Sequence, residues 1–406
     1  MSIIASRLSR IKPSPTIAVT QKARELAAAG RDVIGLGAGE PDFDTPDNIK
    51  DAAIKAIQAG DTKYTAVDGT PALKKAICAK FERENGLKYA PDQITVGVGG
   101  KQVLYNALMA TLNSGDEVII PAPYWVSYPD MVELAEGTPV FVSCPAEQGF
   151  KLQPADLEKA ITPKTKWLIL NSPSNPSGAA YTRDEMKALT DVLVKHPHVW
   201  IMTDDMYEHL LYDGIEFVTP AQVEPALYDR TLTVNGVSKS YAMTGWRIGW
   251  AISNPELVAL CGKIQEALVS CQPAPSQAAA EAAVRGSQEM VEEMRVAYQR
   301  RRDQVRDIFQ PLGMLPAVPE GAFYALVDLR AAGIPSRDLS RMLLEEEHVA
   351  AAPGSTFGDV AEGMLRISLA TADDELREGC KRIVRFARRH GALAAEQEPA
   401  AAGVTA

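Results

Sequence analysis

Short, continuous apolar runs alternate with helical patterns along most of the chain. From residue 94 onward, the runs occupy positions 94–99, 116–125, 138–144, 166–173, 199–207, 231–239 and 246–253. Strands buried on both faces give such unbroken apolar runs, whereas strands with one wet face alternate between apolar and polar residues. Because helical segments separate the runs, the pattern predicts an α/β fold. Its large domain is expected to hold a mostly parallel seven-stranded sheet with helices on both faces.

The pattern changes near residue 306. Apolar runs at 321–329, 349–355 and 364–371 are interleaved with helical stretches near 335–347 and 373–390, which predicts a smaller α+β unit. A chain of 406 residues also exceeds the usual size of one compact unit. We therefore predict four parts: an N-terminal segment (1–45) that docks on the small domain, the large domain (46–306), the small C-terminal domain (307–390) and an alanine-rich, disordered tail (391–406).

Charge and composition exclude several kinds of partner. The formal net charge of −10 disfavours nucleic acid, and the densest basic run, at 300–302, lies in a helical pattern rich in acidic residues, where a solvated helix face is expected. No apolar run approaches the length of a membrane span, so no membrane partner is expected. The histidines are not spaced as zinc ligands, which predicts no metal site, and the five scattered cysteines favour a reducing cytoplasm.

Small, polar and aromatic residues follow the predicted strands at one end of the sheet. Each of five candidates comes at or just after the end of an apolar run: Gly100, Trp125, Asn175, Asp204 and Lys239. In open α/β sheets, ligands bind beyond the carboxyl ends of the strands. These residues are therefore expected to meet in one crevice, although they are far apart in the sequence.

The stretch NGVSKSYAMTGWRIGW (235–250) carries the most specific chemistry. A loop lysine is usually a solvated charge, but Lys239 is followed by tyrosine, methionine and tryptophan side chains that are expected to bury part of the segment. Burial disfavours the ammonium form, lowers the pKa and frees the amine as a nucleophile, as a Schiff-base lysine requires. Arg247 offers a fork of donors suited to a phosphate. Together these two residues indicate pyridoxal phosphate.

Other strand ends supply candidates for the remaining needs of that cofactor. Asp204 follows the apolar run VWIM, where a buried carboxylate is costly unless it meets a cation such as a pyridinium; a helix N-cap is the alternative interpretation. Trp125 suits stacking on a ring, or else packs in the core. Gly100 and Lys101 lie where a strand gives way to a helix, so that free N–H groups can face a phosphate. Arg366, inside the apolar run MLRISLA, requires an anion such as a substrate carboxylate.

The order of the motifs resembles that of a known family. Between about residues 5 and 390 the chain carries, in sequence, AGEPDFDTP, KYTAVDGTPALKKAI, VGVGGKQVLYNAL, PYWVSYP, NSPSNPSG, TDDMYEHL, SKSYAMTGWRIGW, GAFY and LRIS. This ordered set resembles the class I aminotransferases of pyridoxal phosphate fold type I, and within them the aspartate aminotransferase subgroup Ib. The resemblance implies a homodimer with shared active sites.

The resemblance also implies a role for each candidate residue. Lys239 is expected to hold the cofactor aldehyde and then to carry a proton between the substrate α-carbon and the cofactor. The cofactor ring is expected to contact Asp204, Tyr207, Asn175 and Trp125. Its phosphate is expected to contact Gly100, Lys101, Ser238, Arg247 and Tyr64 of the other subunit. The substrate α-carboxylate is expected to bind Arg366, helped by Asn175, Trp125 and the backbone of Gly39.

Two positions depart from the family pattern. Asp204 is followed by Asp205 where an aspartate–glutamate pair is commoner, which leaves open which carboxylate meets the ring; the three-residue step to Tyr207 favours Asp204. The position three before the lysine, a phosphate-binding serine in many class I members, is Gly236. Ser238 is the candidate to replace that serine.

The resemblance further implies ping-pong transamination with 2-oxoglutarate as the usual partner. Dicarboxylates, above all aspartate, are the expected substrates, because a lysine in the motif GGK serves the distal carboxylate in this subgroup and Lys101 matches it. Ser14 and Thr16 are expected to assist as the N-terminal segment closes, and Lys12 matches a lysine associated with prephenate. The alternatives are an aromatic amino acid aminotransferase, a pyridoxal phosphate-dependent lyase on the same fold, and a cofactor-free regulatory relative, for which Lys239 and Arg247 would be unnecessary.

Overall fold

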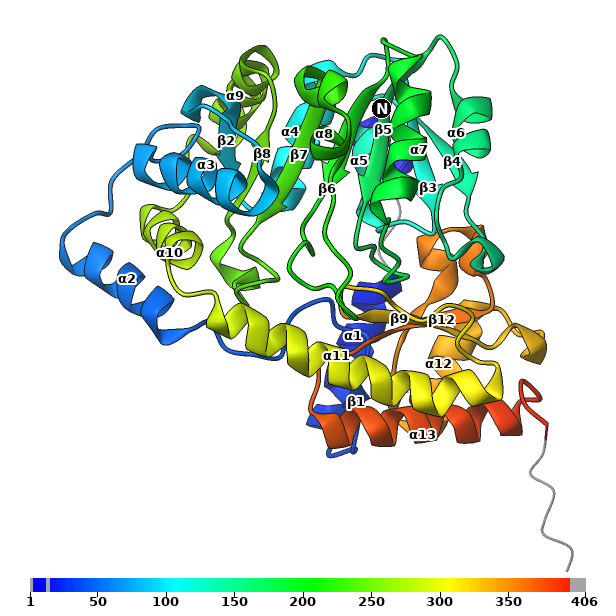
Figure 1. Ribbon diagram of the computed structural model, residues 1–406. Helices are drawn as coiled ribbons and strands as arrows, with labels where there is room; N and C mark the ends of the chain where they lie inside the picture. The colour runs from blue at the N-terminus through cyan, green and yellow to red at the C-terminus, as the bar shows by residue number, and fades with distance from the viewer. Residues whose placement is uncertain (1–2, 12–14, 395–406) are drawn as a thin grey trace, which may run out of the picture.

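The large domain is built on the predicted seven-stranded sheet (Figure 1). The computed structural model describes residues 3–11 and 15–394. Across the sheet the strands are β2 (Ile94–Gly97), β8 (Gly249–Ile252), β7 (Thr231–Gly236), β6 (Trp200–Asp204), β5 (Thr165–Asn171), β3 (Glu117–Ala122) and β4 (Thr138–Ser143). Neighbouring strands pair in parallel except β8, which is antiparallel to both β2 and β7. The predicted fold class is confirmed.

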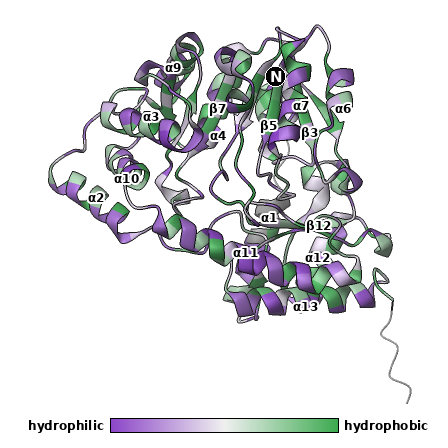
Figure 2. Cartoon of the chain, in the orientation of Figure 1, coloured by the Kyte–Doolittle hydropathy of each residue, from purple (hydrophilic) through white to green (hydrophobic). Residues whose placement is uncertain are grey.

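Both faces of this sheet are covered, which explains the unbroken apolar runs. In β5, Trp167 and Ile169 pack against one layer of helices, whereas Leu168 and Leu170 pack against the other. The first layer contains α4 (Gly100–Thr111), α5 (Ser127–Leu134) and α9 (Pro255–Val269). The second contains α6 (Pro154–Ala160), α7 (Arg183–Val194) and, beside β2 and β8, α3 (Pro71–Asn85) and α10 (Ala274–Arg285). Figure 2 shows hydrophobic colours along the strands and hydrophilic positions on the outer helices.

The smaller unit lies below the large sheet in Figure 1. Its antiparallel sheet has the order β11 (Ala352–Pro353), β12 (Met364–Ser368) and β9 (Tyr324–Asp328), and its helices are α12 (Ser336–Glu347) and α13 (Asp373–Arg389). The apolar run at 349–355 does not form one strand. It divides into β10 (Val349–Ala350) and β11, and the two pair in different sheets.

The N-terminal segment packs beside the smaller unit. After α1 (Pro15–Ala28), β1 (Ile34–Gly35) pairs in parallel with β10, whereas α2 (Asp47–Gln58) packs against α10 of the large domain. The domain boundaries stay predictions. Of the predicted tail, Ala392 and Leu393 pack against the core of the small domain, and residues 395–406 lie outside the described residues.

The basic run at 300–302 lies in α11 (Glu289–Phe309), and the prediction that it forms a solvated face is wrong for two of its members. Arg301 and Arg302 are buried, with 6% and 1% of their surface exposed, and only Arg300 is exposed. Arg301 pairs with Asp42 at 2.8 Å and with Asp373 at 2.9 Å. The helix passes between the large and small units, so successive arginines meet acids from both sides.

Candidate active site

A cavity of about 360 Å3 opens beyond the carboxyl ends of β5, β6 and β7. Most of the predicted site residues line it: Gly39, Gly100, Lys101, Trp125, Asn175, Asp204, Tyr207, Ser238, Lys239, Arg247 and Arg366. They come from separate strand ends, from the start of α4, from the N-terminal segment and from β12 of the small domain. The structure therefore brings together in one cavity the strand-end residues that were predicted to meet.

Lys239 lies on the loop that follows β7, with its amine inside the cavity. The amine donates a hydrogen bond to the carbonyl oxygen of Gly39. Burial lowers the pKa of Lys239 to about 8, Glu40 acts against this shift, and the positive charges of Arg366 and Arg247 reinforce it. A pKa near neutrality keeps part of the amine uncharged, which a nucleophilic lysine requires.

Asp204, at the end of β6, is the acid that faces the cavity. Its Oδ2 accepts a hydrogen bond of 2.7 Å from the Tyr128 hydroxyl, and burial raises the pKa of Asp204 to about 6. Asp205 does not line the cavity; it accepts a 2.5 Å hydrogen bond from the Thr203 hydroxyl, and burial raises its pKa to about 8. The alternation of side chains along an extended chain separates the two acids. Of the pair, Asp204 is placed to meet a ligand.

The start of α4 forms one wall of the cavity and offers free backbone N–H groups. Gly99 precedes the helix with a φ of 82°, and no side chain caps it. The Arg247 guanidinium lies against this turn and donates to the carbonyl oxygens of Thr244 at 2.8 Å and Val98 at 3.2 Å. The positive φ favours glycine at position 99, and a Cβ there would lie 2.2 Å from Arg247 Nη2, so that the arginine would have to move away.

Close backbone contact explains the glycine found in place of serine at position 236. A Cβ on Gly236 would lie 2.9 Å from the Gly249 Cα and 3.0 Å from the Ile248 carbonyl oxygen. A side chain is therefore excluded where β7 and β8 pack this tightly. Ser238, two residues after Gly236, lines the cavity and remains the candidate to replace the missing serine.

Arg366 lies at the opposite end of the cavity and is buried, with 4% of its surface exposed. Its Nη1 donates to Asn175 Oδ1 at 3.1 Å and its Nη2 to the Gly37 carbonyl oxygen at 2.7 Å, whereas the buried Nε has no hydrogen-bond partner. The rings of Tyr324 and Phe357 lie 4.5 and 5.0 Å from the guanidinium carbon. The described hydrogen bonds of Arg366 include no carboxylate, so its charge is available to an anionic ligand.

Several cavity residues escaped the sequence analysis. Tyr128 bonds to Asp204, and the Tyr324 hydroxyl lies 2.9 Å from that of Tyr207. Asn171 donates to the backbone of Asp204 at 2.8 Å and accepts from the backbone of Asn175 at 2.8 Å. Sequence signals exist for two of them: Tyr128 lies three residues after Trp125, whose ring it contacts, and Asn171 is the asparagine that opens NSPSNPSG.

Four predicted residues are not seen in the cavity. Tyr64 lies between α2 and α3 with 91% of its surface exposed. Thr16 lies in α1, but its side chain is outside the described part, and Lys12 and Ser14 are outside the described residues altogether. Within the described part of the chain, no helix is both long and apolar enough to cross a membrane.

A large domain with this strand order, together with a lysine, an acid and a buried arginine in one cavity, fits the class I aminotransferases. The chain belongs to the family of class I and II aminotransferases, whose model matches residues 31–383.

Individual relatives are similar over nearly the whole chain. The aspartate/prephenate aminotransferase of Cereibacter sphaeroides is 61% identical over 397 residues, which cover 95% of this chain and 99% of the relative. Aspartate aminotransferase from Thermus thermophilus with maleate gives a TM-score of 0.89 at 43% identity, covering 95% of this chain and all of that one. An aromatic aminotransferase from Pyrococcus horikoshii gives 0.86 at 38% identity, covering 91% of this chain and all of that one.

Proposed function

We propose that this aminotransferase uses pyridoxal phosphate to transfer the amino group between aspartate and 2-oxoglutarate, and that it also accepts prephenate. One observation carries the proposal: a lysine amine with a pKa near 8 shares a cavity with a buried acid and with an arginine that has no acidic partner among the described residues. A lyase on the same fold would use the same lysine, so the reaction type rests on the family and its relatives.

The residues present fit pyridoxal phosphate. The Asp204 carboxylate suits a protonated pyridine nitrogen, the Trp125 ring suits stacking, and the uncapped start of α4 with Arg247 and Ser238 suits a phosphate. The Tyr207 hydroxyl and Asn175 are the candidates for the ring oxygen. When bound, the cofactor supplies an electron sink for the bonds of the substrate α-carbon.

The remaining chemistry belongs to the chain itself. Lys239 would hold the cofactor at its aldehyde end, and its free amine would act as the base that removes the substrate α-proton and as the acid that gives a proton back. Arg366 orients the substrate through its α-carboxylate, with Asn175 beside it. Tyr128 fixes the orientation of the Asp204 carboxylate through its 2.7 Å hydrogen bond.

Lys101 supports the choice of a dicarboxylate. Its amine lies 4.9 Å from the Trp125 ring centre at the mouth of the cavity, and burial together with Arg247 lowers its pKa. A cation there can pair with the distal carboxylate of aspartate, as the maleate bound by the Thermus thermophilus relative also carries two carboxylates. The roles of Thr16 and Lys12 are proposed from the family pattern alone. Thr16 would assist in binding the distal carboxylate, and Lys12 would assist in binding prephenate.

A homodimer with shared sites is part of the proposal. Tyr64, Ile54, Ile57 and Leu268 are exposed large side chains, with 91%, 49%, 54% and 55% of their surface accessible. A second copy of the chain would cover such exposed side chains. Tyr64 would then reach the phosphate of the other subunit. The five free cysteines support the proposed cytoplasmic location.

The test is a set of steady-state kcat/KM values. Aspartate, tyrosine and phenylalanine are measured as amino donors with 2-oxoglutarate as the acceptor, and prephenate is measured as the acceptor with glutamate as the donor. Aspartate and prephenate are expected to exceed the aromatic amino acids by at least about tenfold, which is about 1.4 kcal/mol of discrimination. A reversed order would make the chain an aromatic aminotransferase and would remove Lys101 from substrate recognition. Full turnover by Lys239→Ala would refute the mechanism itself.

A further inference from the structure

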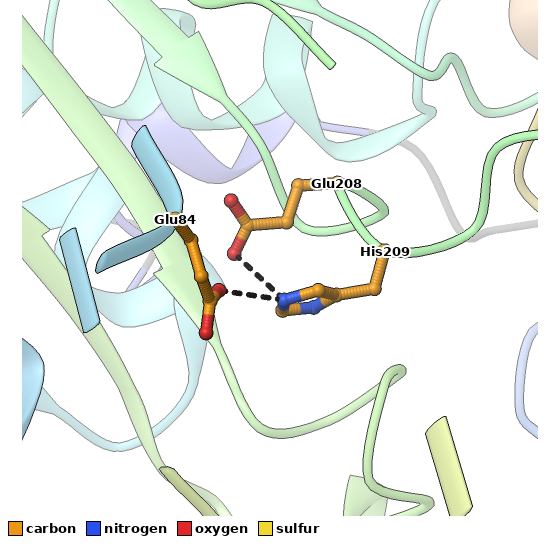
Figure 3. Close-up of side chains that lie close together, drawn as sticks. All are labelled: Glu84, Glu208 and His209. Carbon is orange, nitrogen blue, oxygen red and sulfur yellow. Dashed lines mark hydrogen bonds and ion pairs between the residues drawn. The ribbon is translucent and has the colours of Figure 1, made fainter. Parts of the chain in front are cut away.

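A cluster of charged side chains lies behind the active-site wall and is used by none of the steps above. Glu84 comes from α3, and Glu208 and His209 come from the segment after β6 (Figure 3). His209 Nε2 lies 2.9 Å from Glu84 Oε2 and 3.7 Å from Glu208 Oε1. None of the three lines the active-site cavity.

The cluster already contains its cation, so it is not a metal site. The amine of Lys80, a buried residue of α3, forms an ion pair with Glu208 and lies 3.4 Å from Glu84 Oε2. Asn235, near the end of β7, donates to the same Glu208 oxygen at 2.7 Å. An ammonium and an amide therefore occupy the space and the lone pairs that a metal ion would need.

The cluster joins α3 to both segments that carry active-site residues. Glu208 directly follows Tyr207, and Ser240 directly follows Lys239. His209 Nδ1 lies 3.0 Å from the Ser240 hydroxyl oxygen. The imidazole thus bridges a carboxylate on α3 and the hydroxyl next to the lysine.

The chemistry of the two partners fixes the role of the ring. The side-chain hydrogen bond from His209 helps to hold the pKa of Glu84 at about 2 against its burial, so Glu84 is an acceptor only. His209 Nε2 must then carry a proton, and in the neutral ring Nδ1 accepts the Ser240 O–H. The ring can satisfy both partners in one orientation only.

Side-chain contacts hold much of the lysine loop: the Tyr241 hydroxyl donates to Gln288 at 2.7 Å, and the Thr45 hydroxyl donates to the Ala242 carbonyl oxygen at 2.6 Å. The backbone bonds of the loop are long: Val237 N–H to Ile248 at 3.4 Å, Ala242 N–H to Lys239 at 3.3 Å and Met243 N–H to Ser238 at 3.1 Å. Ala242 has a φ of 51°, which an L-residue adopts at some cost. A loop held in this way depends on its side-chain contacts for a fixed position.

We propose that His209 is a positioning residue: through Ser240 and Glu84 it fixes the lysine loop so that the Lys239 amine reaches the substrate α-proton. The inference rests on the proposed function and adds to it a group that touches neither cofactor nor substrate. Misplacement of a reacting group by about 1 Å can cost about 100-fold in rate, so a loosened loop is expected to slow proton transfer specifically.

Three variants separate the two contacts. His209→Gln keeps an amide near the position of Nε2 and loses Ser240, His209→Asn keeps a polar atom near Nδ1 and loses Glu84, and Ser240→Ala removes the hydroxyl. His390→Gln is the matched control, because His390, just after α13, has its Nε2 2.8 Å from Glu346 of α12 in a comparable pair, and neither residue lines the cavity.

His209→Gln and Ser240→Ala are expected to lower kcat about tenfold while KM for the amino acid stays within about twofold, because Arg366 is untouched. The primary deuterium isotope effect at the α-carbon is expected to increase, which a general loss of folded protein would not cause. Rates for His209→Asn should lie between those of wild type and Ser240→Ala, and His390→Gln should match wild type. Thermal unfolding of each variant checks that the fold survives.

A second measurement does not depend on turnover. The rate at which added pyridoxal phosphate forms its borohydride-reducible bond with Lys239 is expected to fall about tenfold in His209→Gln and Ser240→Ala. Wild-type values of kcat, isotope effect and attachment rate in both variants would overturn the positioning role and leave the proposed function intact. Loss of transamination in the wild type would overturn the function, and the attachment rate would still decide the role of His209.

Discussion

The low pKa of Lys239 can be measured directly in the protein without cofactor. Burial brings this pKa from its ordinary value of 10.5 to about 8. At pH 7 about a tenth of the amine is then uncharged, against about 0.03% for an ordinary lysine, so Lys239 is expected to be about 300-fold richer in the reactive form. The fraction should rise with pH and level off above about pH 9.

Two substitutions should move the titration midpoint in opposite directions. The positive charge of Arg366 disfavours the ammonium form of Lys239, so Arg366→Gln is expected to raise the pKa. The negative charge of Glu40 favours the ammonium form, so Glu40→Gln is expected to lower it. From lowest to highest, the predicted order of the titration midpoints is therefore Glu40→Gln, wild type and Arg366→Gln.

Competitive labelling gives the midpoint. The protein is treated with a trace of acetic anhydride between pH 6 and 11 beside a free amine of known pKa, and the acetylated Lys239 peptide is quantified by mass spectrometry. The free amine corrects for the pH dependence of the reagent. A Lys239 midpoint at the ordinary value of 10.5, or a shift of the same sign in both variants, would refute the link between burial, neighbouring charge and reactivity.

Three further predictions concern other parts of the site. Arg366→Leu should weaken binding of amino acid and oxo acid by about 2–4 kcal/mol, because it removes a charge-assisted pair, and single-turnover titration of each half-reaction measures the loss. Arg301→Met should lower the free energy of unfolding by about 2 kcal/mol in urea at pH 7. Ion pairs with Arg300, the larger influence, and with Arg301 lower the pKa of Asp373 from 3.8 to about 2, so the part of the difference that comes from the Arg301–Asp373 pair should be present above pH 4 and be lost as the pH falls through about 2. Gly249→Ala should cost about 1–3 kcal/mol of stability and weaken cofactor binding, measured by equilibrium dialysis, because its Cβ would lie 2.5 Å from Gly100 N; unchanged affinity would contradict the cradle described at α4.

The sequence pattern predicts the sheet and the convergence of the site because both follow from local rules. Each apolar run marks a buried strand, and the open α/β topology places the strand ends together. The three-residue step to Tyr207 also selects Asp204 rather than Asp205 as the acid that faces the cavity. The structure agrees, since successive side chains of an extended chain point to opposite sides.

What the pattern misses depends on contacts between distant segments. Tyr128 and Tyr324 join the site through partners 76 and 117 residues away, and the sequence around each tyrosine does not identify its partner. Arg301 and Arg302 look like surface charges until the acids of other segments, Asp42 and Asp213, are placed beside them. The division of 349–355 between two sheets likewise depends on β1, more than 300 residues earlier in the chain.

The crossing of backbones at Gly236, Gly249 and Gly100 limits how this enzyme can evolve. A Cβ on either of the first two would meet main-chain atoms within 3.0 Å, and one on Gly100 would meet the Met206 side chain at 2.6 Å. Gly236 and Gly249 therefore cannot gain a side chain by a single substitution, whereas a side chain at Gly100 requires the end of Met206 to move. Variation at this end of the cavity is confined to Lys101, Ser238 and Arg247, so a laboratory library for altered anion specificity should leave the three glycines unchanged and randomise those three side chains.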